Sequence, residues 1–408
     1  MKYSLSFGVL SALALVGCGG QSAPPSPSAP EAGSNAGGAS STGRAGAPSA
    51  GGGAAGQGAF ADGGAFADGG AAGASPECAA VDVGSISVFS NGSWDPLGYP
   101  PYAVDGCTLV YVAPDMGGGA LHVRNLSSGE DSELDASASN PRRPSIAGDV
   151  IAWEVDDGGA SQVRVRYAGK TKTLTGNFEQ AAEPRAARDA VVFTAFLGAK
   201  STADSDVYLY DVVHEELSAV AAGPGQQRFA DVSLSHVAVT DFSEDPRGYF
   251  DEAGSISDIV IVDRQSGVST SRKAEGKQAF PLLGSGGAIV YLDWRAVHPE
   301  PKFSEFWLKA GYIGTAPALD FNLKSEQVHT DPAYVRPSLH GLSVDFVDTQ
   351  SAKVGLYRAT VGSPQAPLAA ALAGSARLLG PVAAARLTLI AEQSLQGQAA
   401  LTLIAVQR

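Results

Sequence analysis

The side chains that could do chemistry are scattered along the chain and form no recognisable catalytic motif. The six histidines lie in different parts of the sequence, and none has the spacing of a metal site. The HExxH, GxSxG, P-loop and CxxC signatures do not occur. The sequence therefore predicts no catalytic residue, no metal ligand and no cofactor.

Charged and aromatic side chains gather in the longest segments between apolar runs, at about 197–205, 243–257 and 295–304. Long loops on a rigid scaffold commonly carry binding functions. The predicted binding face comprises Glu244, Asp245, Arg247, Tyr249, Asp293, Trp294, Arg295 and His298. The alternative is a set of solvated loops held by structural salt bridges. These acidic loops lack the ligand spacing of a calcium loop.

The first cysteine, Cys18, follows a signal-peptide pattern. Lys2 precedes the apolar run 5–16, which is too short for a comfortable membrane span. Leu15 and Gly17 stand three and one residues before Cys18, and this pattern resembles the lipobox of bacterial lipoproteins. The resemblance implies that residues 1–17 are removed and that Cys18 carries the lipid. Gly19, in place of Asp, implies the outer membrane.

The other two cysteines, Cys78 and Cys107, remain as an even pair once Cys18 carries lipid. Exported proteins keep disulfides, so the sequence predicts one bond between them.

Residues 18–76, after the signal peptide, consist mainly of Gly, Ala, Ser and Pro. Such a segment cannot bury enough apolar surface to offset its ordering entropy, so we expect a disordered tether. Its composition resembles that of myxobacterial lipoproteins. The net charge of −14 opposes contact with nucleic-acid phosphates, so nucleic acid is not an expected partner.

Residues 77–408 contain a repeated unit of two apolar strands joined by a Gly/Asp/Ser turn, a polar loop, a third strand and a short fourth strand. The runs are short, rich in β-branched and aromatic residues, and bounded by turn residues, which favours strands over helices. The units begin at Pro101, Pro144, Pro184, Asp231, Pro281, Pro337 and Pro381. Successive units begin 40–56 residues apart, and four short strands at such an interval are typical of a β-propeller.

The predicted fold is therefore an all-β, seven-bladed β-propeller, with six or eight blades as alternatives. The seventh unit ends after its third strand, whereas the alternating strand 85–90 precedes the first unit and has no blade of its own. We expect this N-terminal strand to complete the last blade, because closure removes exposed strand edges.

The repeats resemble those of TolB-type propellers of the bacterial periplasm. The resemblance lies in the Pro-led strand pair, best in Pro144–Thr175, and in Ser205-Asp206-Val207-Tyr208 and its copy at 304–307. It implies a non-enzymatic module that binds a protein or peptide of the cell envelope, periplasmic or surface-exposed and held to the membrane by its lipid. The alternative function is a propeller hydrolase or lyase acting on glycans or peptides.

Overall fold

The computed structural model describes residues 86–89, 97–115, 119–198, 203–250, 255–294, 305–329, 336–349, 355–363, 366–371, 377–384, 387–393 and 400–408. Their regular structure is almost entirely β, with two short 3-10 turns, η1 (Ser285–Gly287) and η2 (Pro317–Leu319). In this part of the chain no helix is long and apolar enough to cross a membrane.

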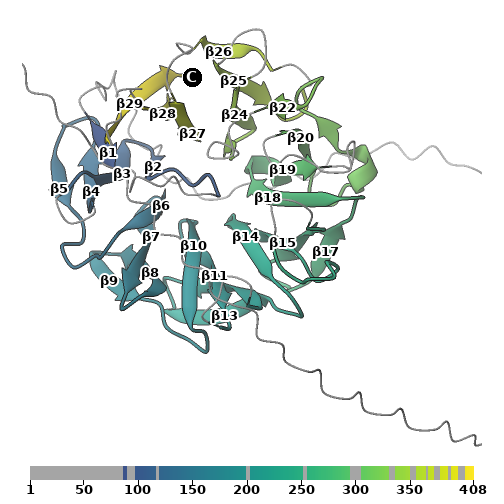
Figure 1. Ribbon diagram of the computed structural model, residues 1–408, viewed down its shortest axis with the longest axis horizontal. Coiled ribbons are helices and arrows are strands. Elements are labelled where there is room, and N and C mark those ends of the chain that lie inside the picture. Colours follow the sequence, from purple (N-terminus) through teal and green to yellow (C-terminus); the bar gives the residue numbers. More distant parts are fainter. Residues whose placement is uncertain are drawn as a thin grey trace, which may run out of the picture. The chain divides into compact units, whose positions relative to one another are not determined.

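The described strands form seven antiparallel sheets arranged in a ring, which confirms the predicted seven-bladed β-propeller (Figure 1). Within each blade the strands follow one another from the channel outwards. The first three blades comprise β2 (Tyr102–Asp105), β3 (Thr108–Ala113), β4 (Ala120–Asn125), β5 (Asp131–Glu133); β6 (Arg142–Ala147), β7 (Val150–Asp157), β8 (Ala160–Tyr167), β9 (Lys170–Thr173); and β10 (Gln180–Ala186), β11 (Ala190–Phe196), β12 (Ser205–Asp211), β13 (Glu216–Ala221).

The remaining four blades follow the same plan, with an additional short strand in blade 5. Their strands are β14 (Gln227–Val232), β15 (His236–Asp241), β16 (Asp258–Asp263), β17 (Ser269–Arg272); β18 (Lys277–Leu283), β19 (Ala288–Trp294), β20 (Glu305–Tyr312), β21 (Phe321–Asn322), β22 (Val328–His329); β23 (Ser338–His340), β24 (Ser343–Asp348), β25 (Gly355–Thr360), β26 (Leu368–Ala371); and β27 (Arg377–Ala383), β28 (Leu387–Gln393), β29 (Ala400–Gln407).

The ring closes through β1 (Ser87–Phe89), as predicted. This strand pairs antiparallel with β29, with Ser87 opposite Thr402, and forms the outer edge of blade 7. The N-terminal and C-terminal parts of the propeller therefore share one sheet, and the last blade gains the fourth strand that its own sequence lacks.

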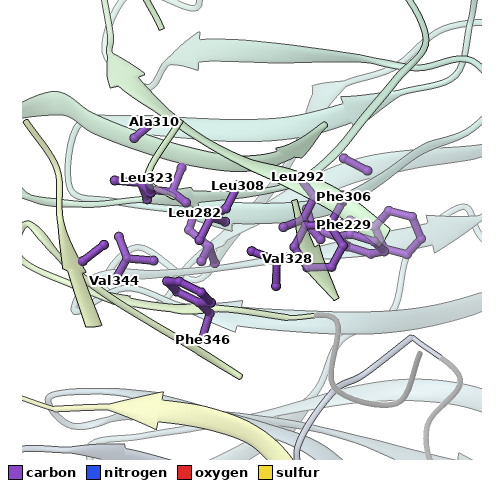
Figure 2. Packing of buried hydrophobic residues seen from close by; sticks show 14 of the residues in the cluster. Phe229, Leu282, Leu292, Phe306, Leu308, Ala310, Leu323, Val328, Val344 and Phe346 are labelled. Atoms are coloured by element: carbon purple, nitrogen blue, oxygen red, sulfur yellow. The ribbon is translucent and has the colours of Figure 1, made fainter. Parts of the chain in front are cut away.

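The core lies between neighbouring blades, because each sheet presents apolar side chains on both faces. All seven residues of β19 are buried, as expected for a strand covered on both sides. In the largest cluster, Leu308 and Leu323 of blade 5 meet Val344 and Phe346 of blade 6 (Figure 2). Burial of each such side chain stabilises the fold by about 1.5–3 kcal/mol.

The proline of the repeat does not always begin the innermost strand, and here the prediction is wrong. Pro101 and Pro337 immediately precede their strands, but Pro144 and Pro281 lie inside β6 and β18, where the strand pairing shifts register. A bulge leaves its extra residue out of the ladder, so proline costs no hydrogen bond there. In blade 4, Ala230 and not Asp231 occupies the proline position, between the register-shifted residues.

In blades 3, 4 and 5 the residue before this proline position adopts a left-handed conformation. The φ angles are 61° at Glu183, 54° at Phe229 and 57° at Phe280, a region that non-glycine residues rarely adopt. The preceding blade supplies an acceptor for each freed N–H. Glu154 accepts the N–H of Glu183 at 3.1 Å, and Thr240 accepts that of Phe280 at 3.1 Å. Contacts between blades thus support the bulge.

The Ser-Asp motif of the repeat also joins consecutive blades. The hydroxyl of Ser205 donates to the carbonyl of Gln227 at 3.2 Å, and that of Ser257 donates to the carbonyl of Gln278 at 2.8 Å. Both acceptors lie on the innermost strand of the next blade, so this part of the motif has a structural role at the seam.

Candidate functional site in the axial channel

A cavity of about 210 Å³ lies on the axis of the ring, and the innermost strand of every blade contributes to its wall. Its lining residues are Tyr99, Pro100, Ala103, Ser145, Ile146, Arg185, Ala186, Asp231, Val232, Phe280, Leu282, Leu283, Arg336, Pro337, Ser338, Leu339, His340, Pro381, Val382 and Ala383. We call this cavity the axial pocket.

The segment that precedes β2 closes the floor of the axial pocket. It enters the centre of the ring beside β2 (Figure 1), and Leu97 and Tyr99 pack in the largest apolar cluster. The guanidinium carbon of Arg336 lies 3.5 Å from the centre of the Tyr99 ring and 4.3 Å from that of Phe280. Its Nε donates to the carbonyl of Leu97 at 2.8 Å. The floor is therefore a buried stack of aromatic rings on a cation.

Tyr99 lies among several cations. Arg143 lies over its ring at 4.9 Å. Burial raises the pKa of Tyr99, and the nearby cations Arg336, Arg143 and Arg185 only partly oppose this effect. The phenol is therefore protonated at neutral pH and can donate a hydrogen bond.

Glu183, at the bulge of β10, is fully buried close to this floor. Burial acts to raise the pKa of Glu183, but the cations Arg228 and Arg143, with hydrogen bonds from Arg228 and Thr194, outweigh it, so the pKa is lowered. Its carboxylate also accepts the N–H of Phe229 at 3.3 Å. Glu183 is thus a charged anchor that holds blades 3 and 4 together.

The axial pocket opens where the innermost strands end. Along β6, Ser145 is buried, Ile146 and Ala147 are half-buried and Gly148 is exposed. The turns after the first and third strands of every blade share this side of the ring, because successive strands are antiparallel. We call it the mouth face. The loops after the second strands lie on the opposite face.

The wall carries an ion pair between neighbouring blades. The Nε of Arg185 donates to Oδ1 of Asp231 at 3.2 Å. His340 lies nearer the mouth, and burial followed by the charge of Arg408 lowers its pKa, against the opposing charge of Asp105. Its imidazole is therefore neutral at pH 7 and adds no charge to the axial pocket.

The predicted binding residues of loop 243–257 differ in exposure and in their contacts. Asp245 is buried and accepts the N–H groups of Arg247 and Ile256 at 2.8 and 2.7 Å, so it shapes the loop. Glu244 is exposed and pairs with Lys273. Arg247 is exposed and lies 5.6 Å from the Tyr249 ring.

The other predicted residues of this face are buried or lie outside the described residues. Asp293 is fully buried and accepts from the Gln278 side chain at 3.3 Å. Trp294 is also buried, with the Lys277 ammonium 4.9 Å from its ring. Arg295 and His298 lie outside the described residues. A binding surface on these loops stays a prediction, on the face opposite the mouth.

The remaining predicted sites also stay predictions. Cys18 and Cys78 lie outside the described residues, and Cys107 is buried at the start of β3. No cluster of three or more His, Cys, Asp or Glu side chains suited to a metal occurs in the described part of the chain.

Reasoning from the sequence missed Arg185, Asp231 and Arg336. The first two follow the proline position of their repeats, and Arg336 precedes Pro337. Polar residues at the same place in successive repeats were the available signal, because each repeat places that position beside the axis. Their mutual distances depend on the closed ring.

No protein-family model matches the sequence, and no similar sequence was found among curated proteins. Solved structures with a similar fold include a TolB from Acinetobacter baumannii, with 13% identity and a TM-score of 0.42 over 63% of this chain and 61% of that one. A putative TolB from Agrobacterium tumefaciens has 12% identity and a TM-score of 0.40 over 56% and 81%. An acylaminoacyl peptidase from Pyrococcus horikoshii has 12% identity and a TM-score of 0.53 over 80% and 52%.

The similarity to the peptidase concerns the fold alone, and the chain spans about half of that enzyme. Activities and partners do not follow from a fold at such low identity.

Proposed function

We propose that the protein is a lipid-anchored component of the bacterial cell envelope whose propeller binds a protein or peptide partner without catalysing a reaction. The N-terminal pattern ending in Cys18 supports the anchor, in the outer membrane and facing the periplasm or the cell surface. The closed ring supports the binding role, because it holds its turns and pocket on a rigid frame.

The observation that carries this proposal is the distribution of exposed apolar side chains. Seven large apolar residues are exposed among the described residues, and five of them lie in turns of the mouth face. These five are Val213, Leu234, Val268, Leu319 and Leu342. Leu234 and Leu342 follow innermost strands, and the other three lie in turns farther from the axis. Exposed apolar side chains that gather on one face of a rigid scaffold favour that face as a surface that another molecule covers.

The enzymatic alternative finds less support in the described residues. Glycoside hydrolysis requires two carboxyl groups that flank the scissile bond. Among the described lining residues of the axial pocket the carboxylate is that of Asp231, and both of its oxygens already accept hydrogen bonds. The similarity to a peptidase extends to the fold alone.

The experiment that tests partner binding compares the two faces of the ring. Leu234→Asp with Val268→Asp alters the mouth face, and Leu197→Asp with Ile256→Asp alters the opposite face, where both side chains are 44% exposed. Each variant is expressed as the full chain in its own envelope and crosslinked. We expect the mouth-face variant to lose the crosslinked partner and the opposite-face variant to keep it. Equal recovery from all three proteins would contradict the proposal.

A further arm tests the loop surface that the sequence predicts. Combined substitution of Glu244, Arg247 and Tyr249 by alanine alters exposed or half-buried side chains of loop 243–257. Loss of the partner from this variant alone would place the binding surface on the opposite face.

The anchor and the disulfide have separate tests. We expect Cys18→Ala to move the protein from the membrane fraction to the soluble fraction, and an unchanged distribution would contradict lipidation. Mass spectrometry of unreduced protein should find Cys78 joined to Cys107, and two free thiols would contradict the bond.

A further inference from the structure

The axial pocket contains more hydrogen-bond donors than acceptors. Both oxygens of its carboxylate, Asp231, already accept a hydrogen bond: Oδ1 accepts from Arg185 at 3.2 Å and Oδ2 accepts from the N–H of Leu283 at 2.7 Å. Asp231 therefore orients the wall and offers little to a ligand.

The hydroxyl groups of the pocket are placed to donate. Ser145 and Ser338 accept the N–H groups of Ala186 and Ala383, each at 2.9 Å. Among the described residues no acceptor takes the hydroxyl proton of either serine. Polar groups in a folded protein normally have partners, so these two donors can meet an acceptor from outside the chain.

Arg185 adds the charge that such an acceptor would meet. Its Nε holds Asp231, whereas no described residue accepts from its two terminal nitrogens. Arg336 places a second guanidinium at the floor.

We propose that the axial pocket binds a small carboxylate, held by the terminal nitrogens of Arg185 as a bidentate pair. The fork of an arginine matches the two oxygens of a carboxylate. The hydroxyls of Ser145 and Ser338 supply further donors. This inference is independent of the protein partner proposed above, because it concerns the channel and not the mouth face.

The size and remaining lining of the pocket narrow the ligand. A volume of about 210 Å³ equals the share of roughly seven liquid waters, at ~30 Å³ each. Ile146, Leu282, Leu339 and Val382 give the wall an apolar part. The ligand is therefore a short aliphatic monocarboxylate, either a free acid or the C-terminal residue of a peptide. Inorganic phosphate offers no apolar surface to these side chains, so it should bind more weakly than an aliphatic carboxylate.

Calorimetric titration of the full chain in detergent tests this site. The probes are 3-methylbutyrate, its amide, inorganic phosphate, and a tetrapeptide ending in valine with a free or an amidated C-terminus. We expect saturable 1:1 binding of the carboxylates and at least tenfold weaker binding of the amides and of phosphate. Higher affinity for the peptide with a free C-terminus would assign the site to the C-terminal residues of peptides. Higher affinity for 3-methylbutyrate would assign it to small carboxylic acids.

Two arginine variants and a matched control locate the binding group. Arg185→Lys keeps the charge that pairs with Asp231 but loses the fork, so affinity should fall about tenfold with an unchanged melting temperature. Arg185→Met should abolish binding. Arg188→Met removes an equal charge from an exposed turn of the same blade and should leave affinity unchanged. Absence of carboxylate binding, equal binding of phosphate, or full affinity in Arg185→Met would overturn the proposal.

Discussion

Replacement of Glu183 by glutamine should strongly destabilise the ring. Its fully buried carboxylate pairs with Arg228, accepts from Thr194 at 2.7 Å and supports the N–H of Phe229. Glutamine keeps the shape of the side chain but leaves the Arg228 cation without its counter-charge. Removal of one partner from a buried pair costs about 3–5 kcal/mol. With an m-value of about 3 kcal/mol/M, the urea midpoint should fall by about 1 M or more.

The pH dependence gives this prediction a second, independent reading. Because the folded-state pKa of Glu183 lies below its ordinary value of 4.5, its stabilising effect is present above pH 4.5 and is lost as the pH falls through the folded-state pKa. The difference in free energy of unfolding between the wild type and Glu183→Gln should therefore be largest at pH 7 and should decrease below pH 4.5. Glu179→Gln, at an exposed position of the same blade, should change stability by less than about 0.5 kcal/mol. The reasoning would be refuted if Glu183→Gln lost no more stability than Glu179→Gln. It would also be refuted if the difference in free energy of unfolding between the wild type and Glu183→Gln stayed constant from pH 7 to pH 3.

Three further predictions concern the junctions of the ring, each measured by thermal unfolding. Tyr102→Phe should lower the free energy of unfolding by about 1–3 kcal/mol, because the Tyr102 hydroxyl donates to the carbonyl of Gly380 and accepts the N–H of Ala391, both in blade 7. Wild-type stability would contradict this. Arg408→Met should lower the free energy of unfolding by about 1–3 kcal/mol, because the Nε of Arg408 lies 3.4 Å from the fully buried carboxylate of Asp345. A loss of stability below about 0.5 kcal/mol would contradict this role. The lowered pKa of His340 means that its contribution is complete above its ordinary value of 6.5 and declines as the pH falls below it. His340→Asn should lose stability less steeply from pH 6.5 to 5 than the wild type, and parallel curves would exclude this role.

The blade architecture could be predicted from local patterns. Strand lengths, turn residues and the repeat interval are properties of short segments, and each predicted unit corresponds to one blade of the ring. The closing strand could be predicted by counting strands in each unit. The seventh unit has three strands, and one strand before the first unit belongs to no blade of its own.

The bulges could not be predicted in the same way. Residues before proline disfavour helical backbone angles, so Glu183 and Phe280 would be expected to be extended. Their left-handed conformation is held by acceptors on the preceding blade, far away in the sequence. Local propensity therefore predicts the proline at the start of the strand. In the folded protein, hydrogen bonds to the preceding blade place it at a bulge inside the strand.

The candidate site escaped prediction for the same physical reason. Arg185 and Asp231 are 46 residues apart, and they meet because equivalent positions of neighbouring repeats converge on the axis. Trp294 and Asp293, by contrast, have the composition of a binding loop but are buried in the sheet. Residue type near a loop does not distinguish a side chain that faces solvent from one that faces the next blade.

The central claim is that β1 closes the ring by pairing with β29. Ser87 lies opposite Thr402, so Ser87→Cys with Thr402→Cys, in a chain whose native cysteines are replaced by serine, places two sulfurs across the antiparallel pair. Mass spectrometry after mild oxidation should find a peptide that joins the two positions. Little of it should form from Ser87→Cys with Ala400→Cys, where the second cysteine lies two residues out of register. Absence of the first linked peptide, with both cysteines reactive to alkylation in the folded protein, would contradict the closure.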